Sequence, residues 1–194
     1  MVFSSDFLRI VKSVLKESRR FLVPSIGEDD GLILYTISYL YGSINENITA
    51  VDLGAGIGYS TIWIAKGIDD SYSSSGEVIA VERKKERVIK AKEILSKLPL
   101  KKTLIKVLNT DAIMFLRGLT SEGKRIDLAF VDIDKFLYLD AFLLLKKVMK
   151  ENGVALFHNA YFSSANKLIT YLNEHNYNYT IVPTGEGIIV IIMK

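Results

Sequence analysis

A glycine-rich segment, residues 52–60, is the first part of this sequence that could do chemistry, because Asp52 precedes the alternate glycines Gly54, Gly56 and Gly58. Glycines let a backbone approach a ligand closely, and a helix that begins after them offers free N–H groups. The glycine spacing is tighter than G-x-G-x-x-G and no phosphate-binding lysine follows, which excludes a P-loop. The Asp52 carboxylate suits a ligand with an amino group rather than a pyrophosphate. A tight strand-to-helix turn without a ligand is the alternative. The expected ligand contacts are Asp52, Gly54, Ala55, Gly58, Tyr59 and Ser60.

Polar residues also end the next two apolar runs. Glu82 follows residues 78–81, and an acid at this place accepts hydrogen bonds from a ribose diol. Alternatively, Glu82 is only a neighbour of a helix N-terminus, where the helix dipole favours an acid. Residues 109–112 follow the third run, where an adenine amino group would lie, so Asp111 and Ala112 are candidate contacts. Asp111 could equally be only the N-cap of the next helix.

A second polar group ends two later runs. It comprises Asp132, Asp134 and Lys135 after residues 128–131, and His158 and Asn159 after residues 154–157. Ligands of open α/β sheets bind at the carboxyl ends of the strands, so both parts should lie at one edge. On position alone, Asp132 is a candidate metal ligand. Asp134 either caps the following helix or orients Lys135. His158 is either a ligand or a hydrogen-bonded histidine that lines the cleft.

The elements that would position these residues alternate between strand and helix after residue 47. Short apolar runs bounded by polar residues or glycine predict buried strands. These strands are expected at residues 48–53, 78–81, 104–108, 128–131 and 154–157. Helical patterns lie between them at residues 60–66, 84–98, 111–119 and 136–149, the second of which stops at Pro99. The alternation indicates βαβ units and a parallel sheet.

The two ends of the chain differ from this middle part. Residues 4–42 hold two helical patterns, and a last helix over 164–174 precedes strands over 177–182 and 187–193. The turn between these strands is so short that it can only join antiparallel neighbours. We therefore predict one domain over residues 1–194, with N-terminal helices (1–42) and an α/β, Rossmann-like core (47–194). The core is a doubly wound, seven-stranded sheet, mostly parallel with one antiparallel strand and with helices on both faces.

Composition narrows the class of protein. Hydrophobic residues make up 49% of the 194 residues, which fits a sheet covered on both faces, while no apolar run reaches the roughly 18 residues of a membrane span. The N-terminus has no basic region followed by an apolar one, so we expect no signal peptide. Cysteine is absent, which excludes thiolate metal sites and favours a cytoplasmic location. The net charge of +3 is too small to argue for nucleic acid by itself.

Three segments resemble the cation-dependent O-methyltransferases, a family that includes caffeoyl-CoA and catechol O-methyltransferases. Residues 51–61 (VDLGAGIGYST) look like the Gly-Tyr-Ser type of loop in that family. Residues 130–138 (FVDIDKFLY) are similar to its F-x-D-A-D-K-x-x-Y segment, and residues 183–187 (PTGEG) to the P-x-G-D-G before its last strand. The likeness covers roughly residues 20–194.

The resemblance implies an S-adenosylmethionine (SAM)-dependent methyltransferase in which Asp132 contributes to both the cofactor site and a divalent-cation site. The family has an Asp-Asn pair where this chain has His158 and Asn159, and a longer loop after it; Thr110 stands where a Gly is usual. With Asp132, His158 and Asn159 as ligands, two oxygen donors and one imidazole suit Mn²⁺, Fe²⁺, Co²⁺ or Zn²⁺ better than Mg²⁺.

The implied reaction is an in-line displacement at the methyl group of a sulfonium, which is chiefly a positioning task. A cation that holds the acceptor oxygen makes the hydroxyl more acidic, and Lys135 is the expected base, with Asp132 beside it. The alternative for Lys135 is an exposed surface lysine. The expected acceptor is a small phenolic or catechol-like molecule.

The sequence also agrees with two other functions and with two kinds of partner, RNA and a second copy of the chain. One function is methylation of a hydroxylated tRNA base, and the other is cofactor binding without catalysis. Basic residues that could contact RNA are Arg19, Arg20, Lys97, Lys101, Lys102 and Lys106, although charge runs are usually solvated faces. Apolar residues at helical spacing near the N-terminus indicate a helix packed on the domain or on a second subunit, or a lid over the acceptor. They are Phe7, Ile10, Val11, Val14 and Leu15. We expect a homodimer.

Overall fold

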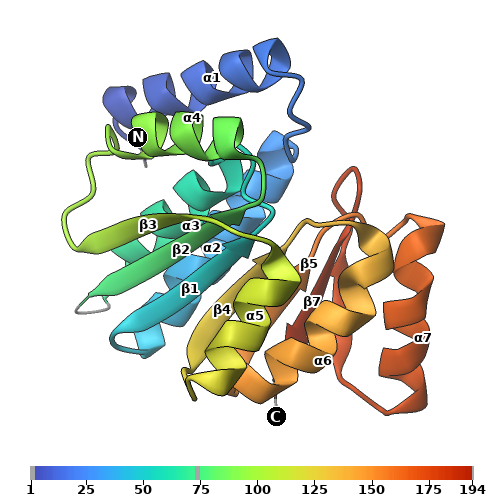
Figure 1. Cartoon of the computed structure of the whole chain (residues 1–194). Coiled ribbons are helices and arrows are strands. Elements are labelled where there is room, and N and C mark those ends of the chain that lie inside the picture. The colour runs from blue at the N-terminus through green and yellow to red at the C-terminus, as the bar shows by residue number, and fades with distance from the viewer. Residues whose placement is uncertain (1–2, 73–74, 194) are drawn as a thin grey trace.

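A twisted seven-stranded sheet forms the centre of the computed structural model, which describes residues 3–72 and 75–193 (Figure 1). The strand order is β3-β2-β1-β4-β5-β7-β6. The bounds are β1 Ile48–Leu53, β2 Gly76–Glu82, β3 Thr103–Asn109, β4 Ile126–Val131, β5 Met149–Phe157, β6 Tyr179–Val182 and β7 Ile188–Ile192. The pairs from β3 to β5 are parallel, and β7 runs antiparallel to both β5 and β6. The predicted sheet, mostly parallel with one antiparallel strand, is confirmed.

Helices cover both faces of the sheet (Figure 1). On one side lie α1 Ser5–Arg20, α2 Glu28–Ile44, α3 Tyr59–Asp70 and α4 Lys85–Leu95, and on the other α5 Ala112–Ser121, α6 Tyr138–Val148 and α7 Asn166–Glu174. Alternate strand residues supply the two cores, because successive side chains of a strand point to opposite faces. Ala50 packs into the first core and Val51 into the second. The predicted Rossmann-like, doubly wound arrangement is confirmed.

The N-terminal helix α1 packs on the rest of the molecule through its apolar face. Phe7, Val11 and Val14 are buried, and the Phe7 ring lies edge-on to Trp63 of α3 at 5.6 Å between ring centroids. The Ser4 hydroxyl caps the helix by accepting a hydrogen bond from the Phe7 N–H at 3.3 Å. The prediction that this face packs on the domain is thus confirmed. Among the described helices, none combines the length and the apolar composition needed to cross a membrane.

The turn after β1 brings three strand ends together. The Gly54 N–H donates to the Val81 carbonyl at the end of β2, and the Asp132 N–H donates to the Leu53 carbonyl, both at 2.9 Å. Gly54 has a φ of +92°, and a Cβ there would overlap the backbone carbonyl of Asp132. Only glycine fits this position, because it alone tolerates both the left-handed backbone and the close approach. The glycine turn therefore fixes β1, β2 and β4 at one edge.

Several element boundaries differ from the predicted ones. The helix expected over residues 84–98 ends at Leu95, and the chain continues in tighter turns, with the Leu98 N–H bonded to the Leu95 carbonyl at 3.2 Å. Pro99 disfavours helical backbone at the residue before it, which explains the early end. The helix expected from residue 136 starts with a 3-10 turn, Lys135–Leu137, before α6. β5 begins at Met149, five residues before the expected run, which starts at residue 154.

Candidate functional site

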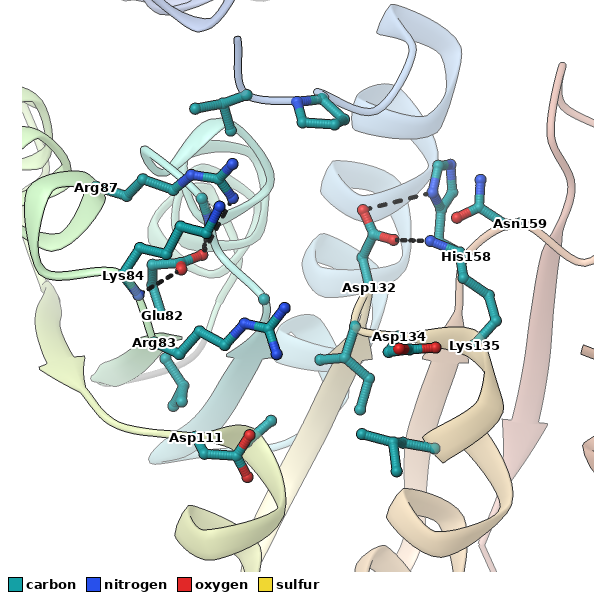
Figure 2. A pocket seen from close by; sticks show the side chains of 18 of the residues that line it. Glu82, Arg83, Lys84, Arg87, Asp111, Asp132, Asp134, Lys135, His158 and Asn159 are labelled. Atoms are coloured by element: carbon teal, nitrogen blue, oxygen red, sulfur yellow. Dashed lines mark hydrogen bonds and ion pairs between the residues drawn. The ribbon is translucent and has the colours of Figure 1, made fainter. Parts of the chain in front are cut away.

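A cavity of about 580 Å³ opens at the carboxyl edge of the sheet (Figure 2). Its walls come from the turns after β1, β2, β3, β4 and β5, together with residues 23–25 after α1. This is the edge at which doubly wound sheets bind ligands, and the volume lies within the range of small-molecule sites. The two polar groups that the sequence singles out therefore share one cavity.

One wall of the cavity is formed by the glycine turn and Glu82. Gly54, Gly56 and Glu82 all line it. The Gly56 N–H donates to Oε2 of Glu82 at 3.1 Å, and the Lys84 N–H donates to Oε1 at 2.8 Å. An Arg87 guanidinium nitrogen lies 4.0 Å from Oε2 (Figure 2). These contacts hold a 5% exposed carboxylate at the cavity surface next to the glycine backbone, as the sequence predicts for a ribose site.

Asp52 lies behind the glycine turn rather than on the cavity wall. Its side chain is fully buried, and Oδ2 accepts hydrogen bonds from the Ser60 hydroxyl at 2.7 Å and from the Thr61 hydroxyl. In the part of the chain that the structure describes, Oδ1 has no hydrogen-bond partner. Burial raises the pKa of Asp52 to about 6, although the two hydroxyls act in the opposite direction. The side chain joins the end of β1 to the first turn of α3.

The other residues of the glycine segment divide between two positions. Several line a smaller cavity of about 20 Å³ that shares residues with the larger one; they are Gly54, Ala55, Gly56, Ile57, Tyr59 and Ser60. Gly58 instead occupies the N-cap of α3 with a φ of +99°, and a Cβ there would lie 3.0 Å from the Leu95 side chain. Gly58 therefore contributes to the shape of the turn without lining either cavity.

Asp111 and Ala112 line the cavity opposite the glycine turn. Oδ1 of Asp111 accepts hydrogen bonds from the N–H groups of Ile113 at 2.9 Å and Met114 at 3.1 Å. The N-cap interpretation of Asp111 is therefore confirmed. Its place on the cavity wall is compatible with the adenine contact that was the equal alternative.

Charged side chains form a row at the other end of the cavity. Oδ1 of Asp132 lies 3.1 Å from Nζ of Lys135, and Oδ2 lies 3.7 Å from Nδ1 of His158 (Figure 2). On its far side, Nε2 of His158 is hydrogen-bonded to Oδ2 of Asp30 at 3.0 Å. Both Asp30 and His158 are only 2% exposed. The structure thus brings Asp132, Lys135 and His158 together, and it adds Asp30 from the first turn of α2.

The pKa values in this row follow from the pairing of opposite charges. Burial alone would lower the pKa of His158, but the carboxylates of Asp132 and Asp30 raise it to about 9. Burial would raise the pKa of Asp132, yet His158 and Lys135 hold it below its usual value. Burial would raise the pKa of Asp30, but the hydrogen bond and charge of His158, together with hydrogen bonds from Thr184 and Gly27, lower it.

Asn159 and Asp134 complete this end of the site. Asn159 lies beside His158 (Figure 2) and is nearly buried, with a left-handed φ of +56°. Its amide nitrogen donates to Glu186. Oε2 of Glu186 also lies 3.8 Å from Nε2 of His158. Oδ1 of Asp134 accepts the Phe136 N–H at 3.2 Å, so Asp134 is the cap of the 3-10 turn that carries Lys135.

The donor set at this end fits a divalent cation with few protein ligands. No group of three or more His, Asp or Glu side chains arranged for a metal ion occurs among the described residues. A site here would have Asp132, His158 and the amide of Asn159. Nδ1 of His158 is buried without a hydrogen bond to any described residue, and it faces Oδ2 of Asp132. An imidazole nitrogen and a carboxylate oxygen facing each other in this way are the ligands that transition-metal ions take.

Several parts of the site were not predicted from the sequence, among them Asp30, Glu186 and residues 23–25. Asp30 precedes His158 by 128 residues, and Glu186 follows Asn159 by 27. Residues 23–25 line both cavities. The acidic run that opens α2 signals a helix N-terminus, and Asp30 does accept the Gly27 N–H at 2.8 Å. Nothing in that local pattern indicates that Asp30 also contacts His158 at the end of a distant strand.

Comparisons with known proteins agree with this geometry. The model of the family described as O-methyltransferase matches residues 11–175. A flavonoid 3',5'-methyltransferase of Vitis vinifera is 27% identical over 151 residues, which are 76% of this chain. The chain spans about 60% of the length of that relative.

Solved structures share the fold over nearly the whole chain. The O-methyltransferase from Bacillus cereus, in complex with SAH, has a TM-score of 0.83 at 19% identity and covers 96% of this chain and 91% of its own. The O-methyltransferase TomG from Streptomyces achromogenes, in complex with SAM, has a TM-score of 0.75 at 16% identity and covers 99% and 91%. Because the family model covers most of the sequence, this protein belongs to the O-methyltransferase family.

Proposed function

We propose that this protein transfers a methyl group from SAM to a hydroxyl group of a small phenolic or catechol-like acceptor. One observation carries the proposal: the glycine turn with Glu82 shares a single cavity with Asp132, Lys135 and His158. The proposed site for the methyl donor and the groups that would handle an acceptor proton thus line one cavity. Membership of the O-methyltransferase family supports the same reaction.

The residues that line the cavity fit SAM. Glu82 would accept hydrogen bonds from the ribose diol, and the backbone at Gly54 and Gly56 leaves room for close approach. Asp111 and Ala112 would lie beside the adenine. SAM supplies a methyl group bound to a positively charged sulfur, and the carboxylate of Asp132 at the same cavity is complementary to that charge.

The acceptor side of the cavity combines apolar and charged groups. Leu137 and Phe162 line the same cavity as Lys135. Phe162 is 50% exposed, so its ring is available to an aromatic acceptor. Stacking there would hold a phenolic ring while its hydroxyl lies near Lys135. The acceptor of the Vitis vinifera relative, a flavonoid, has this kind of ring and supports the choice.

Lys135 is the group that we propose takes the acceptor proton. Its Nζ lies 3.1 Å from Oδ1 of Asp132, which orients it. A divalent cation bound at Asp132 would favour the neutral amine, which takes the proton of the acceptor hydroxyl and becomes an ammonium ion next to the negative oxygen. Asp132, His158 and Asn159 would hold a divalent cation, and we propose Mn²⁺, Co²⁺, Fe²⁺ or Zn²⁺ rather than Mg²⁺ because one ligand is an imidazole. A cation bound there would supply Lewis acidity to the acceptor hydroxyl.

The first test is the affinity for SAM, measured by calorimetry. Glu82→Gln should weaken binding by about 1–3 kcal/mol, because a charged hydrogen-bond partner is lost. Glu77→Gln is the matched control on the same strand, since Glu77 pairs with Lys106 at the opposite end of β2 and does not line the cavity. Equal affinity in the Glu82 variant would remove Glu82 from the site, and binding of NAD in place of SAM would refute the function.

The alternative functions predict different results. The basic residues considered for RNA do not line the cavity, and Lys106 is already paired with Glu77. A salt-sensitive affinity for tRNA, with methylated tRNA as product, would favour the RNA alternative. SAM binding without transfer to any phenol, catechol or tRNA would favour a cofactor-binding protein.

We also propose a homodimer of single-domain chains in the cytoplasm. Large apolar side chains are exposed on α2, namely Leu32, Leu40 and Ile44. Exposed apolar surface of this kind is a common feature of subunit interfaces. The absence of cysteine from the sequence supports the cytoplasmic location.

A further inference from the structure

Asp30 is a buried carboxylate beside the site to which the proposed function assigns no contact with the cofactor or the acceptor. It lies in the first turn of α2, where Oδ2 accepts the Gly27 N–H at 2.8 Å and is bonded to Nε2 of His158 at 3.0 Å. Asp30 does not line the larger cavity, whereas His158 does. Among the residues that line the larger cavity, His158 is the one to which the Asp30 side chain is hydrogen-bonded in the described residues.

The two ring nitrogens of His158 have different neighbours. A hydrogen bond from Nε2 to a carboxylate requires the proton to be on Nε2. Glu186 strengthens this preference, because its Oε2 lies 3.8 Å from the same nitrogen. Nδ1 has no hydrogen bond to any residue that the structure describes, and it faces Oδ2 of Asp132 at 3.7 Å.

The two oxygens of Asp132 are divided in a matching way. Oδ1 pairs with Lys135, while Oδ2 is directed to the His158 side (Figure 2). Nδ1 and Oδ2 together form a nitrogen–oxygen pair on two residues that line the cavity, and Oδ2 is not the oxygen that pairs with the lysine. Histidine ligands of metal ions usually donate their other N–H to a carboxylate, which fixes the tautomer and the ring orientation.

We propose that Asp30 is a positioning residue for a metal ion: it keeps a proton on Nε2 of His158, so that the ion displaces the proton of Nδ1 to solvent and binds Nδ1 together with Oδ2 of Asp132. The inference rests on the cation that is part of the proposed function. It adds which atom of His158 binds the ion and which residue makes that atom available. Both nitrogen and oxygen donors then face the ion, a combination that suits Co²⁺, Mn²⁺ or Zn²⁺.

Metal affinity, measured apart from catalysis, tests this role. Co²⁺ is titrated into the chelator-treated protein with SAM present, and binding is followed by visible absorption and by calorimetry. Asp30→Asn should weaken Co²⁺ binding about 10- to 100-fold, as loss of such a partner typically does, while SAM affinity stays unchanged. Asp29→Asn is the matched control, because Asp29 is the adjacent acid. Among the described residues, its side chain accepts a hydrogen bond from the Gly185 N–H and has no bond to His158.

Different failures have different meanings. Wild-type Co²⁺ affinity in Asp30→Asn would overturn the role of Asp30. A wild-type protein that binds SAM but neither Co²⁺ nor Zn²⁺ would overturn the metal site and leave the cofactor part of the proposed function intact. Loss of SAM binding in the wild type would instead refute the proposed function itself.

A second measurement avoids any folding defect in the variant, since Asp30 also caps α2. Nitrogen-15 NMR of the wild-type protein with Zn²⁺ reports which nitrogen of His158 carries the proton. We expect the proton on Nε2 and the metal on Nδ1. The opposite assignment, or a His158 whose signals do not respond to Zn²⁺, would overturn the proposal.

Discussion

Replacing Asp52 with asparagine should change how the stability of the protein depends on pH. Asp52 is fully buried, and burial raises its pKa from the ordinary 3.8 to about 6. A tenfold change in proton affinity corresponds to about 1.4 kcal/mol, so the difference corresponds to about 3 kcal/mol. A carboxyl group with a raised pKa stabilises the folded state while it is protonated. This contribution is complete below pH 3.8 and is lost as the pH rises through about 6.

Asp52→Asn cannot ionise, and its amide oxygen can still accept hydrogen bonds from Ser60 and Thr61. Any strain that the new amide introduces is the same at every pH. Relative to the wild type, the variant should therefore become more stable by about 2 kcal/mol between pH 4 and pH 7, the part of the full difference that develops in this range.

Urea unfolding of both proteins at several pH values, followed by circular dichroism, measures this difference. Asp140→Asn is the control, because Asp140 is an exposed acid on α6, on the opposite side of the sheet. A stability difference between Asp52→Asn and the wild type that stays constant from pH 4 to pH 7 would refute the assignment of a raised pKa to Asp52.

Three further predictions concern the turn, the base and the assembly. Gly54→Ala should lower the free energy of unfolding by several kcal/mol, since a Cβ there meets the carbonyl of Asp132 and φ is +92°; Gly118→Ala, where a Cβ meets nothing within 4 Å in a helix, should instead stabilise by about 1 kcal/mol. Urea unfolding checks both, and a Gly54→Ala protein as stable as the wild type would contradict the account of the turn. Lys135→Met should lower the rate of methyl transfer about 100-fold or more, as for loss of a general base, with unchanged SAM affinity. Lys150→Met is the control: it breaks the 2.9 Å pair with Asp127 and should leave the rate as it is. Equal rates in the two lysine variants would exclude a catalytic Lys135. Light scattering at micromolar concentration should give the mass of two chains, and a mass of 21.8 kDa would reject the homodimer.

The order of strands and helices could be predicted because each element has its own local pattern. Short apolar runs bounded by glycine or polar residues mark strands wherever they occur, and the glycine turn after β1 is a local feature of this kind. The ends of helices follow less directly from the sequence. The end of α4 at Leu95, for example, depends on which turn conformations the few residues before Pro99 adopt.

The direction of the Asp52 side chain could also have been predicted from the sequence. Side chains alternate along a strand, so Asp52 shares its side of β1 with Ala50, which packs in the core under α1 to α4. This direction leads to Ser60 and Thr61 of α3 rather than to the cavity. A contact of Asp52 with the cofactor stays a prediction.

Asp30 and Glu186 could not be predicted, for a different reason. Asp30 reaches His158 only because α2 packs with its first turn over the end of β5, and Glu186 lies in the turn that returns β7 to the same edge. Both contacts depend on the packing of distant segments, which no local spacing encodes.

The most direct test of the central claim is to follow the methyl group itself. The wild-type protein is incubated with SAM labelled with carbon-13 in the methyl group, a panel of phenols and catechols, and divalent cations, and the products are analysed by NMR. We expect a labelled methoxy carbon on the ring of at least one acceptor. SAM bound by the protein with no label on any acceptor oxygen, or label found on nitrogen or carbon instead, would contradict it.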